Sequence, residues 1–384
     1  MSYSKKILVF FMIATMAVLT LAGCGGGGAS NDDSQSASGD VIKIGTLGPL
    51  TGNVATYGIS VKNGVEIAVD EFNADGGIDG KEIKLFSEDT RGDQTEAAST
   101  ANKLIQQDNV LAIVGGVISS ETMTAGPISN DAKVVMISPS STATGVPEIG
   151  DYVFRNCLSD EVQAIQLAEY AANEMGIKKF AIIYHNNDYG LSLKDAFEEK
   201  AKELAEVTNV EAYNEGESDF RAQLTKIKNY EPDALYIAGY YTEAAKIAQQ
   251  AREQGLDVQI LGADGFYSPK LIELGGDAVE NVIFTAGFFT DDPAENVQSF
   301  VSAYKDKFGS EPDMFAAQAY DAAKILLTAI KNSGGEGGEK LQSEMAKIKD
   351  FPGITGKTSF TSTGDALKDI IKLKVENGKF VKVK

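Results

Sequence analysis

The fold of this chain is decided by the stretch Val134-Val135-Met136-Ile137-Ser138-Pro139-Ser140-Ser141-Thr142-Ala143-Thr144. Its first four residues form an unbroken apolar run, which predicts a buried strand. Pro139 lacks an N–H group and fixes its φ angle, so it ends the strand and turns the chain. Open α/β sheets bind ligands at the carboxyl ends of their strands. The amides and hydroxyls after Pro139 are therefore candidates to face a small anion such as a carboxylate.

A second hydroxyl-bearing run, Ser119-Ser120-Glu121-Thr122, follows another apolar run at 110–114. Ser119 or Ser120 could cap the next helix, whose free amides favour negative charge. Glu121 is expected to be a solvated helix residue. Either run alone could be an ordinary strand exit, because Ser and Thr abound in turns. Two such runs after successive parallel strands favour a cleft.

Strands and helices alternate on both sides of these two runs. In the first part of the chain, the predicted strands are 41–47, 82–86, 110–114 and 134–138, with helices at 61–72 and 95–107. The pattern restarts with strands predicted at 179–184, 207–213, 234–238 and 258–261, again separated by helices. This order predicts two α/β domains, each a doubly wound parallel sheet covered by helices.

The last hundred residues hold more elements than the end of one domain needs. Their predicted elements are strands at 281–286, 354–360 and 370–375, helices at 297–307, 315–331 and 341–348, and a terminal hairpin around Asn377-Gly378. We therefore expect the chain to cross back to the first domain and to finish in the second.

Composition limits the classes of function. The 384 residues suffice for two domains, and 43% of them are hydrophobic. The formal net charge of −20 makes nucleic acid a poor partner. His185 is the only histidine, which excludes zinc sites that need two imidazoles, and no metal or other cofactor is expected. An exported hydrolase remains a weak alternative, because it would depend on His185 and the chain lacks a Gly-x-Ser-x-Gly motif.

The N-terminus predicts export. Residues 1–23 carry Lys5 and Lys6 before an apolar stretch at 7–19, as a signal peptide does. The stretch ends in Leu21-Ala22-Gly23-Cys24, which looks like a bacterial lipobox, so Cys24 is expected to be lipidated. Residues 24–40 then form a flexible tether of Gly, Ser and Asp. A plain secretory signal with an incidental cysteine is the alternative, and both interpretations place the protein outside the cytoplasm.

The candidate ligand residues lie at the predicted carboxyl ends of strands and divide by chemistry. The first domain offers the hydroxyls of Tyr57, Ser119, Ser140 and Thr142; the second offers Tyr189, Tyr240, Tyr241, Asp264, Phe266 and Tyr267. Such a division suits a zwitterion with an apolar tail, with Asp264 facing an ammonium group. Asp264 could instead be a turn former, the tyrosines ordinary half-buried packing, and His185 a hydrogen-bonded residue at a strand end.

Six motifs give the chain a family resemblance. From about residue 41 to residue 384 it resembles the type I periplasmic solute-binding proteins of ABC importers, in the leucine/isoleucine/valine-binding group. The motifs are Gly48-Pro49-Leu50-Thr51-Gly52 with Tyr57-Gly58, Asn73-Ala74-Asp75-Gly76-Gly77-Ile78-Asp79-Gly80, Ser119-Ser120, Ser138-Pro139-Ser140-Ser141-Thr142, Asp188-Tyr189-Gly190 and Gly239-Tyr240.

The resemblance implies two lobes joined by three crossing segments. Residues 41–157 and 286–362 would form lobe 1, and residues 158–285 and 363–384 would form lobe 2. The implied ligand is a branched-chain or related amino acid, which the protein would deliver to a membrane permease without catalysis. An amide, a small carboxylate or an aromatic acid as ligand, and a sensory role, remain alternatives.

The resemblance also implies roles for individual residues. Ser119, Ser140 and Thr142 would hold the α-carboxylate, and Thr142 would also touch the amine. The side chain of the ligand would be surrounded by Tyr57, Tyr189, Tyr240 and Phe315. Asp264 would face the α-ammonium at a position where the best-matched members of the family usually have Glu, so the amine would sit deeper or be reached through water.

Overall fold

The computed structural model describes residues 41–383. The predicted signal peptide, the tether and Cys24 lie outside the described residues. Within residues 41–383, no helix combines the length and the apolar character that a membrane crossing requires.

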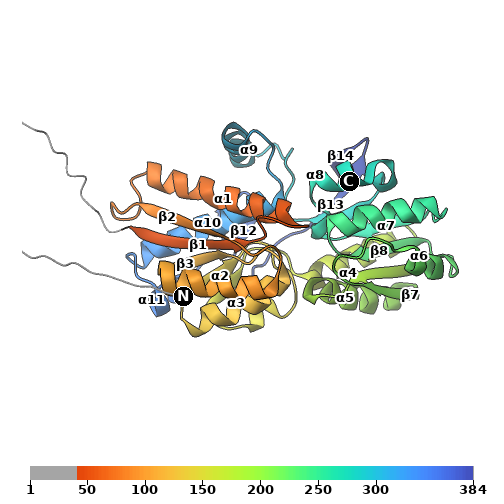
Figure 1. Cartoon of the computed structure of the whole chain (residues 1–384). Helices are drawn as coiled ribbons and strands as arrows, with labels where there is room; N and C mark the ends of the chain where they lie inside the picture. The colour runs from red at the N-terminus through yellow and green to blue at the C-terminus, as the bar shows by residue number, and fades with distance from the viewer. Residues whose placement is uncertain (1–40, 384) are drawn as a thin grey trace, which may run out of the picture. The chain divides into compact units, whose positions relative to one another are not determined.

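The first lobe is built on a sheet of five parallel strands in the order β2-β1-β3-β4-β5. The strands are β1 (Ile42–Gly48), β2 (Ile83–Asp89), β3 (Ala112–Gly115), β4 (Val135–Ser138) and β5 (Val153–Arg155). The helices that belong to this lobe are α1 (Ala55–Ala74), α2 (Gln94–Lys103), α3 (Ser119–Asp131), α9 (Glu295–Phe308), α10 (Met314–Asn332) and α11 (Gly338–Ala346). Figure 1 shows the orange α1 beside the blue α10, although they are far apart in sequence.

Helices α1 and α10 pack closely because Gly64 carries no side chain. A Cβ atom at Gly64 would lie 2.1 Å from the carbonyl oxygen of Ala316, so only glycine permits this approach. The contact places Tyr57, near the start of α1, against Phe315, near the start of α10.

The second lobe contains a sheet of seven strands in the order β14-β13-β10-β9-β8-β6-β7. Five strands are parallel: β6 (Lys179–His185), β7 (Glu206–Tyr213), β8 (Ala234–Ala238), β9 (Gln259–Gly262) and β10 (Ile283–Ala286). The terminal hairpin adds the antiparallel strands β13 (Ile371–Glu376) and β14 (Lys379–Lys382). The helices of this lobe are α4 (Asp160–Asn173), α5 (Asp188–Leu204), α6 (Arg221–Lys228), α7 (Tyr241–Glu253) and α8 (Pro269–Gly275).

The chain passes between the two lobes three times. It leaves the first sheet after β5, returns after β10 to form α9 and α10, and leaves again before β13. A small two-stranded sheet, β11 (Phe351–Gly353) and β12 (Gly356–Thr358), precedes the last crossing. The structure thus confirms the predicted fold class of two doubly wound lobes with three connections.

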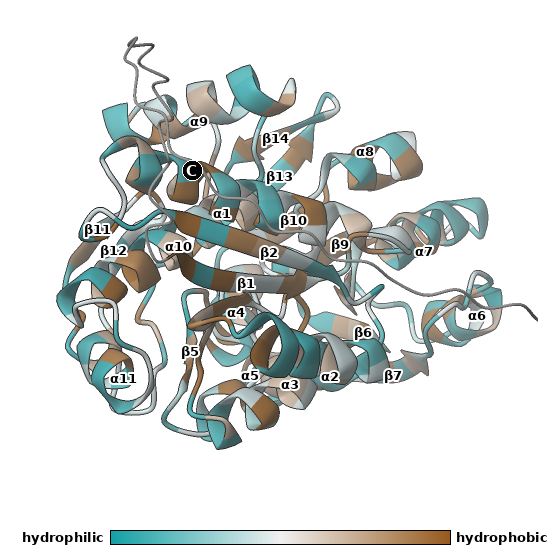
Figure 2. Ribbon diagram, turned by 60° about the vertical axis from the view of Figure 1, so that its left-hand side comes forward, coloured by the Kyte–Doolittle hydropathy of each residue, from teal (hydrophilic) through white to brown (hydrophobic). Residues whose placement is uncertain are grey.

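The apolar residues lie in the sheets and on the inner faces of the helices. The central strands β4 and β8 are buried along their whole length, as strands of a parallel sheet covered on both faces are. In Figure 2, brown apolar segments run along strands such as β1, while α6 and α7 carry much teal, hydrophilic surface. This pattern is why the continuous apolar runs in the sequence predicted the strands correctly.

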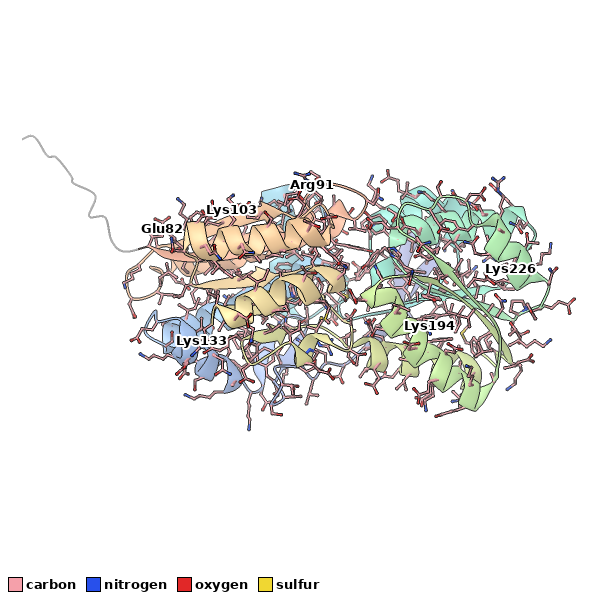
Figure 3. The ribbon with its side chains drawn as sticks, turned by 60° about the horizontal axis from the view of Figure 1, so that its bottom comes forward. Glu82, Arg91, Lys103, Lys133, Lys194 and Lys226 are labelled. Carbon is pink, nitrogen blue, oxygen red and sulfur yellow. The ribbon has the colours of Figure 1, made fainter. Side chains whose placement is uncertain are left out.

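Surface charges contribute little to this architecture. Figure 3 labels Lys133 and Lys226, whose ammonium groups pair with Glu339 at 2.7 Å and with Glu211 at 2.8 Å. Such exposed ion pairs are worth at most about 1 kcal/mol each. The stability of the lobes therefore comes mainly from their apolar cores.

Some predicted elements differ from the observed ones. The single strand predicted at 354–360 is the β11–β12 hairpin, and the helix predicted at 95–107 ends at Lys103, followed by a π-helical turn, Leu104–Asp108. Strand β5 was not predicted, because three residues are too few to show a period. The terminal hairpin is as expected, with positive φ at both Asn377 and Gly378.

Candidate functional site

The two hydroxyl-rich loops of the first lobe lie side by side at the carboxyl ends of β3 and β4. The Ser138 hydroxyl donates to the carbonyl oxygen of Gly116 at 2.7 Å, and the Ser140 hydroxyl donates to that of Val117 at 2.6 Å. In the same direction, the Ala143 amide donates to the Ser119 hydroxyl at 3.2 Å. The two runs singled out in the sequence thus form one polar surface.

Glu121 corrects two expectations at this surface. It is fully buried rather than solvated, and its carboxylate accepts the Thr90 hydroxyl and the amides of Val117 and Ile118, at 3.1 and 3.3 Å. Burial raises the pKa of Glu121 to about 7. Neither Ser119 nor Ser120 caps α3, because both lie inside the helix and Glu121 takes that role by reaching back from its first turn.

Asp264 lies after β9 on the opposing lobe. Its Oδ1 accepts the Tyr189 hydroxyl at 2.7 Å, and its amide donates to Gln163 Oε1 at 3.2 Å. Burial raises the pKa of Asp264 to about 6, although these hydrogen bonds partly oppose the shift. The Tyr189 hydroxyl also accepts the Gly265 amide at 2.9 Å, so the short segment 264–265 is held in place from two sides.

Aromatic rings from both lobes meet between these polar groups. The Tyr57 ring stacks on Phe315 with centroids 4.1 Å apart, and Tyr189 stacks on Tyr240 at 5.1 Å. Tyr57 approaches Tyr240 edge-on at 5.9 Å, and its hydroxyl donates to the Gly265 carbonyl of the other lobe. The four rings form an apolar wall across the boundary between the lobes.

A small cavity lies at the centre of these groups. Seven of the eight ligand residues expected from the sequence line it, together with Val117, Ile118 and Gly265; the seven are Tyr57, Ser119, Ser140, Tyr189, Tyr240, Asp264 and Phe315. Its volume is about 10 Å³, which is room for about one water molecule. An amino acid can occupy this place only if the lobes move apart and the rings turn aside.

Thr142 is the eighth expected residue, and it lies beside the cavity rather than in its lining. Thr142 is fully buried, and its hydroxyl oxygen has no hydrogen-bond partner among residues 41–383. The Asp160 carboxylate is near enough for this hydroxyl to lower its pKa, so the hydroxyl can turn either to that carboxylate or to a ligand that reaches it.

Asp160 is a candidate residue that the sequence analysis missed. It is fully buried, and neither of its carboxylate oxygens has a hydrogen-bond partner in the described part of the chain. Burial and the charge of Asp264 raise the pKa of Asp160 well above its ordinary value, while the neighbouring hydroxyls of Thr142 and Ser192 act in the opposite direction. In sequence, an acidic residue directly after the N-cap Ser159 looks like a solvated residue of the first helical turn. No local signal distinguishes such a solvated acid from a buried one.

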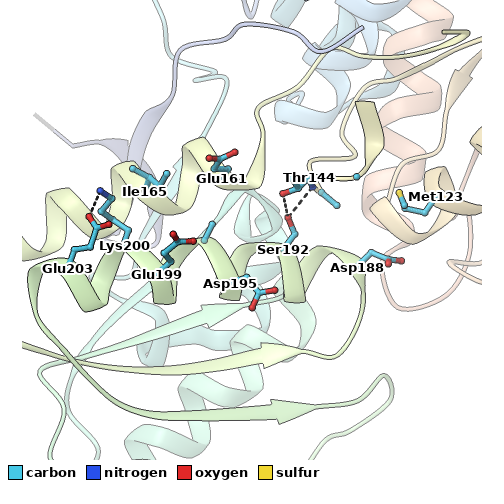
Figure 4. Close-up of a pocket in the computed structure, with 13 residues that line it drawn as sticks. Met123, Thr144, Glu161, Ile165, Asp188, Ser192, Asp195, Glu199, Lys200 and Glu203 are labelled. Carbon is cyan, nitrogen blue, oxygen red and sulfur yellow. Dashed lines mark hydrogen bonds and ion pairs between the residues drawn. The ribbon is translucent and has the colours of Figure 1, made fainter. Parts of the chain in front are cut away.

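A larger cavity, of about 610 Å³, lies along helices α4 and α5 (Figure 4). Figure 4 shows the backbone amide and hydroxyl of Thr144, from the first lobe, bonded to the Ser192 hydroxyl of the second, at 3.1 and 3.0 Å. Five of its thirteen lining residues are acidic, among them Glu161, Asp195 and Glu199. Since it brings together none of the expected ligand groups, the smaller cavity is the candidate ligand site.

The other notable side chains have structural surroundings. His185 stacks on Tyr213 with centroids 5.0 Å apart and contacts Asn187 through Nδ1, and burial lowers its pKa to about 4. Cys157 is a buried free thiol, and burial raises its pKa. Among residues 41–383, no cluster of acidic, histidine and cysteine side chains could hold a metal ion.

Comparison with known proteins identifies the family. The model of the periplasmic binding protein family matches residues 41–379. The chain is 33% identical to the Leu/Ile/Val-binding protein BraC3 of Rhizobium johnstonii over 88% of this chain and 93% of that protein. It is 30% identical to the leucine-, isoleucine-, valine-, threonine- and alanine-binding protein of Pseudomonas aeruginosa, over 86% and 89%.

Solved structures agree with the sequence comparison. The leucine-binding protein LivK of Thermotoga maritima superposes with a TM-score of 0.84 at 35% identity, covering 90% of this chain and 98% of that one. The substrate-binding protein LivJ of Streptococcus pneumoniae, solved in complex with isoleucine, gives 0.83 at 35% identity, covering 89% and 100%. The chain therefore belongs to the periplasmic binding protein family, in its type I, leucine/isoleucine/valine-binding group.

Proposed function

We propose that this protein captures a branched-chain or related amino acid between its lobes and delivers it to the permease of an ABC importer. The observation that carries the proposal is the division of the cavity lining. Hydroxyls and amides lie on the first lobe, a buried carboxylate lies on the second, and aromatic rings lie between them. The names of the relatives, which bind leucine, isoleucine and valine, support the same ligand class.

The proposed contacts follow the charge of each group. Ser119, Ser140 and Thr142 take the α-carboxylate, since hydroxyls and backbone amides donate to anions. The Ser140 hydroxyl, which donates to the Val117 carbonyl in this structure, must rotate toward the ligand to do so. Asp264 takes the α-ammonium. Asp160 lies near enough to Asp264 for the charge of Asp264 to raise its pKa, and it adds a second carboxylate that attracts the ammonium. Tyr57, Tyr189, Tyr240 and Phe315 enclose the apolar side chain. Burying a Val, Leu or Ile side chain among such rings is worth roughly 1.5–3 kcal/mol.

Binding then requires hinge closure between lobe 1, residues 41–157 and 286–362, and lobe 2, residues 158–285 and 363–384. The ligand stabilises the closed arrangement because only that arrangement lets both lobes contact it. No covalent bond changes in this cycle, so we assign no catalytic residue. The family is one of binding proteins, which agrees with this assignment.

The proposed location is the outer face of the cytoplasmic membrane. Export would remove residues 1–23, and a lipid on Cys24 would hold the protein through the tether 24–40. A permease lies in the same membrane, so an anchored protein delivers its ligand over a short distance.

A thermal-shift screen tests the ligand class. Residues 25–384 are purified, stripped of bound ligand by unfolding and refolding, and screened against the twenty amino acids, simple amides and carboxylic acids. A ligand at about 100 times its Kd adds about 2.7 kcal/mol of stability, which gives a clear shift. We expect shifts with leucine, isoleucine and valine.

The other outcomes each contradict a part of the proposal. Thermal shifts with amides, or with acids that lack an amine, would contradict the proposed ammonium binding by Asp264 and Asp160. The proposed transport role would still stand. No shift with any compound would contradict the ligand class and would favour a sensory protein with a different signal.

A further inference from the structure

Arg155, at the end of β5, is a buried cation that the proposed binding scheme does not use. Only 2% of its side chain is exposed. Its Nη1 atom donates to the carbonyl oxygens of Thr142 and Ala143, at 2.8 and 2.9 Å. The guanidinium therefore holds the backbone of the loop that carries the proposed carboxylate donors.

Arg155 and Ser119 form hydrogen bonds to the same peptide group from opposite sides. The C=O and N–H of one planar peptide point in opposite directions. The C=O between Thr142 and Ala143 accepts from Arg155, while the N–H of that peptide donates to the Ser119 hydroxyl. The orientation of this peptide is thus fixed, and with it the position of the Thr142 side chain.

Asp365 fixes Arg155 in turn. Its carboxylate accepts two parallel hydrogen bonds, Nε to Oδ1 at 2.6 Å and Nη2 to Oδ2 at 3.0 Å. Such a bidentate pair sets the plane of the guanidinium as well as its position. Asp365 lies in the segment that connects β12 to β13, at the last crossing between the lobes.

The turn that presents Asp365 is itself fitted against β5. The Arg155 amide donates to the carbonyl oxygen of Gly364 at 3.1 Å. Gly364 has a φ of +76°, and a Cβ atom there would lie 2.7 Å from the Val153 carbonyl oxygen. Only glycine allows this close contact. Gly364 thus lets the turn pack against β5, which places the neighbouring Asp365 carboxylate beside Arg155.

We propose that Arg155 is a positioning residue for the ligand carboxylate, and that Asp365 holds it in the effective orientation. Arg155 does not line the cavity; it acts through the loop 140–143, whose carbonyl groups it holds away from the ligand. The inference rests on the proposed function, in which that loop binds the carboxylate of an amino acid.

The test compares two ligands that differ only at the carboxylate end. Dissociation constants of leucine and leucinamide are measured by calorimetry for the wild type, Arg155→Lys and Asp365→Asn. Lysine keeps the charge but cannot hold two carbonyl groups and a carboxylate in one plane. We expect leucine binding to weaken at least ~10-fold and leucinamide binding less than ~3-fold, so that the preference for the carboxylate falls.

Arg252→Lys is the matched control. Arg252, at the end of α7, also donates through Nη1 to two carbonyl oxygens, those of Leu256 and Val258, at 2.9 and 3.0 Å. It has an acidic neighbour as well, Asp257, at 3.8 Å. Because it lies away from the cavity, both dissociation constants should stay at their wild-type values. An equal loss for the two ligands in the Arg155 and Asp365 variants, or no loss, would overturn the inference.

A second measurement needs no ligand. Hydrogen exchange of the Ser141 and Ala143 amides, both hydrogen-bonded to serine hydroxyls, reports the order of the loop. We expect faster exchange in Arg155→Lys and Asp365→Asn than in Arg252→Lys, and equal rates would overturn the inference. If the wild type binds neither compound, the proposed function fails, and the exchange rates still decide whether Arg155 positions the loop.

Discussion

Replacing Asp264 by Asn tests the proposed ammonium site most directly. Asparagine has nearly the same shape, and its carbonyl oxygen can still accept the Tyr189 hydroxyl that lies 2.7 Å from Oδ1. The substitution therefore removes mainly the negative charge. A hydrogen bond to a charged group contributes about 1.5–3 kcal/mol, and 1.4 kcal/mol corresponds to a tenfold change. We expect leucine to bind roughly 10- to 100-fold more weakly, as measured by calorimetry at pH 7.5.

The pH dependence gives the same prediction a second readout. Burial raises the pKa of Asp264 to about 6, so the carboxyl group becomes protonated below this pH and can no longer pair with an ammonium ion. Leucine affinity should be nearly constant from pH 7 to 8 and should fall below pH 6, by at most about tenfold per pH unit for one proton. Asp264→Asn should flatten the part of this profile that Asp264 causes.

The stability of the ligand-free protein should change with pH in the opposite direction to the leucine affinity. A carboxyl group whose pKa is higher in the folded than in the unfolded state contributes fully to stability at a pH below its pKa in the unfolded state. For Asp264 this contribution is lost as the pH rises through about 6. At pH 8 the ionised Asp264 is buried without a ligand cation, so Asp264→Asn should be more resistant to urea than the wild type. Affinity and stability are then expected to change in opposite directions.

Asp321→Asn is the control for these measurements. Asp321 is also fully buried, on α10, and accepts the amides of Ile354 and Thr355 at 2.9 and 2.8 Å. It lies outside the cavity lining, so its substitution should leave the leucine affinity unchanged. A leucine dissociation constant of Asp264→Asn within about twofold of the wild-type value would refute the reasoning. Loss of a buried charge partner should weaken binding by more than that.

Three further predictions concern other parts of the molecule. Tyr241→Phe removes the contacts of its hydroxyl with the Asn53 carbonyl and the Thr56 hydroxyl across the lobes, at 3.0 and 2.9 Å. Stopped-flow measurements should show ~3- to 10-fold faster ligand release with little change in the association rate, as the loss of ~1 kcal/mol implies; an unchanged release rate would contradict this. Glu121 has a pKa raised to about 7, so urea stability should decrease as the pH rises through 7, and Glu121→Gln should lose this slope; equal slopes in both proteins would count against it. Cys24→Ser should abolish incorporation of labelled fatty acid and leave the unprocessed precursor, whereas continued labelling would place the lipid elsewhere.

The sequence was sufficient to predict the fold and most of the cavity lining, because the signals are local. Apolar runs predicted the buried strands, and the hydroxyl-rich stretch from Ser138 to Thr144 marked the end of β4. The parallel order of the strands then placed the loops after β3, β4 and β9 at the edges where ligands bind, whereas Phe315, on α10, was expected only from the family resemblance. Strand ends in a parallel sheet share one edge, so predicting the order of elements also predicts which loops meet.

The residues that sequence analysis missed are buried charges. Glu121, Arg155 and Asp160 look like ordinary solvated residues in sequence, since each ends a strand or stands in the first turn of a helix. Their burial depends on contacts that close only in three dimensions: Glu121 with Thr90, and Arg155 with Asp365, 210 positions away. No periodicity or local motif contains that information.

The two buried acids of the second lobe explain why closure should depend on the ligand. Asp160 and Asp264 are both buried in this structure, and the charge of Asp264 helps to raise the pKa of Asp160. Arg155, the nearby cation, is already paired with Asp365 and with the loop carbonyls. An ammonium group between the two acids would supply the missing charge, whereas lobes that close without one must leave a carboxylate uncompensated or take up a proton. We therefore expect ligands that lack an amine to close the lobes poorly near neutral pH, so that the permease meets a closed protein mainly when an amino acid is inside.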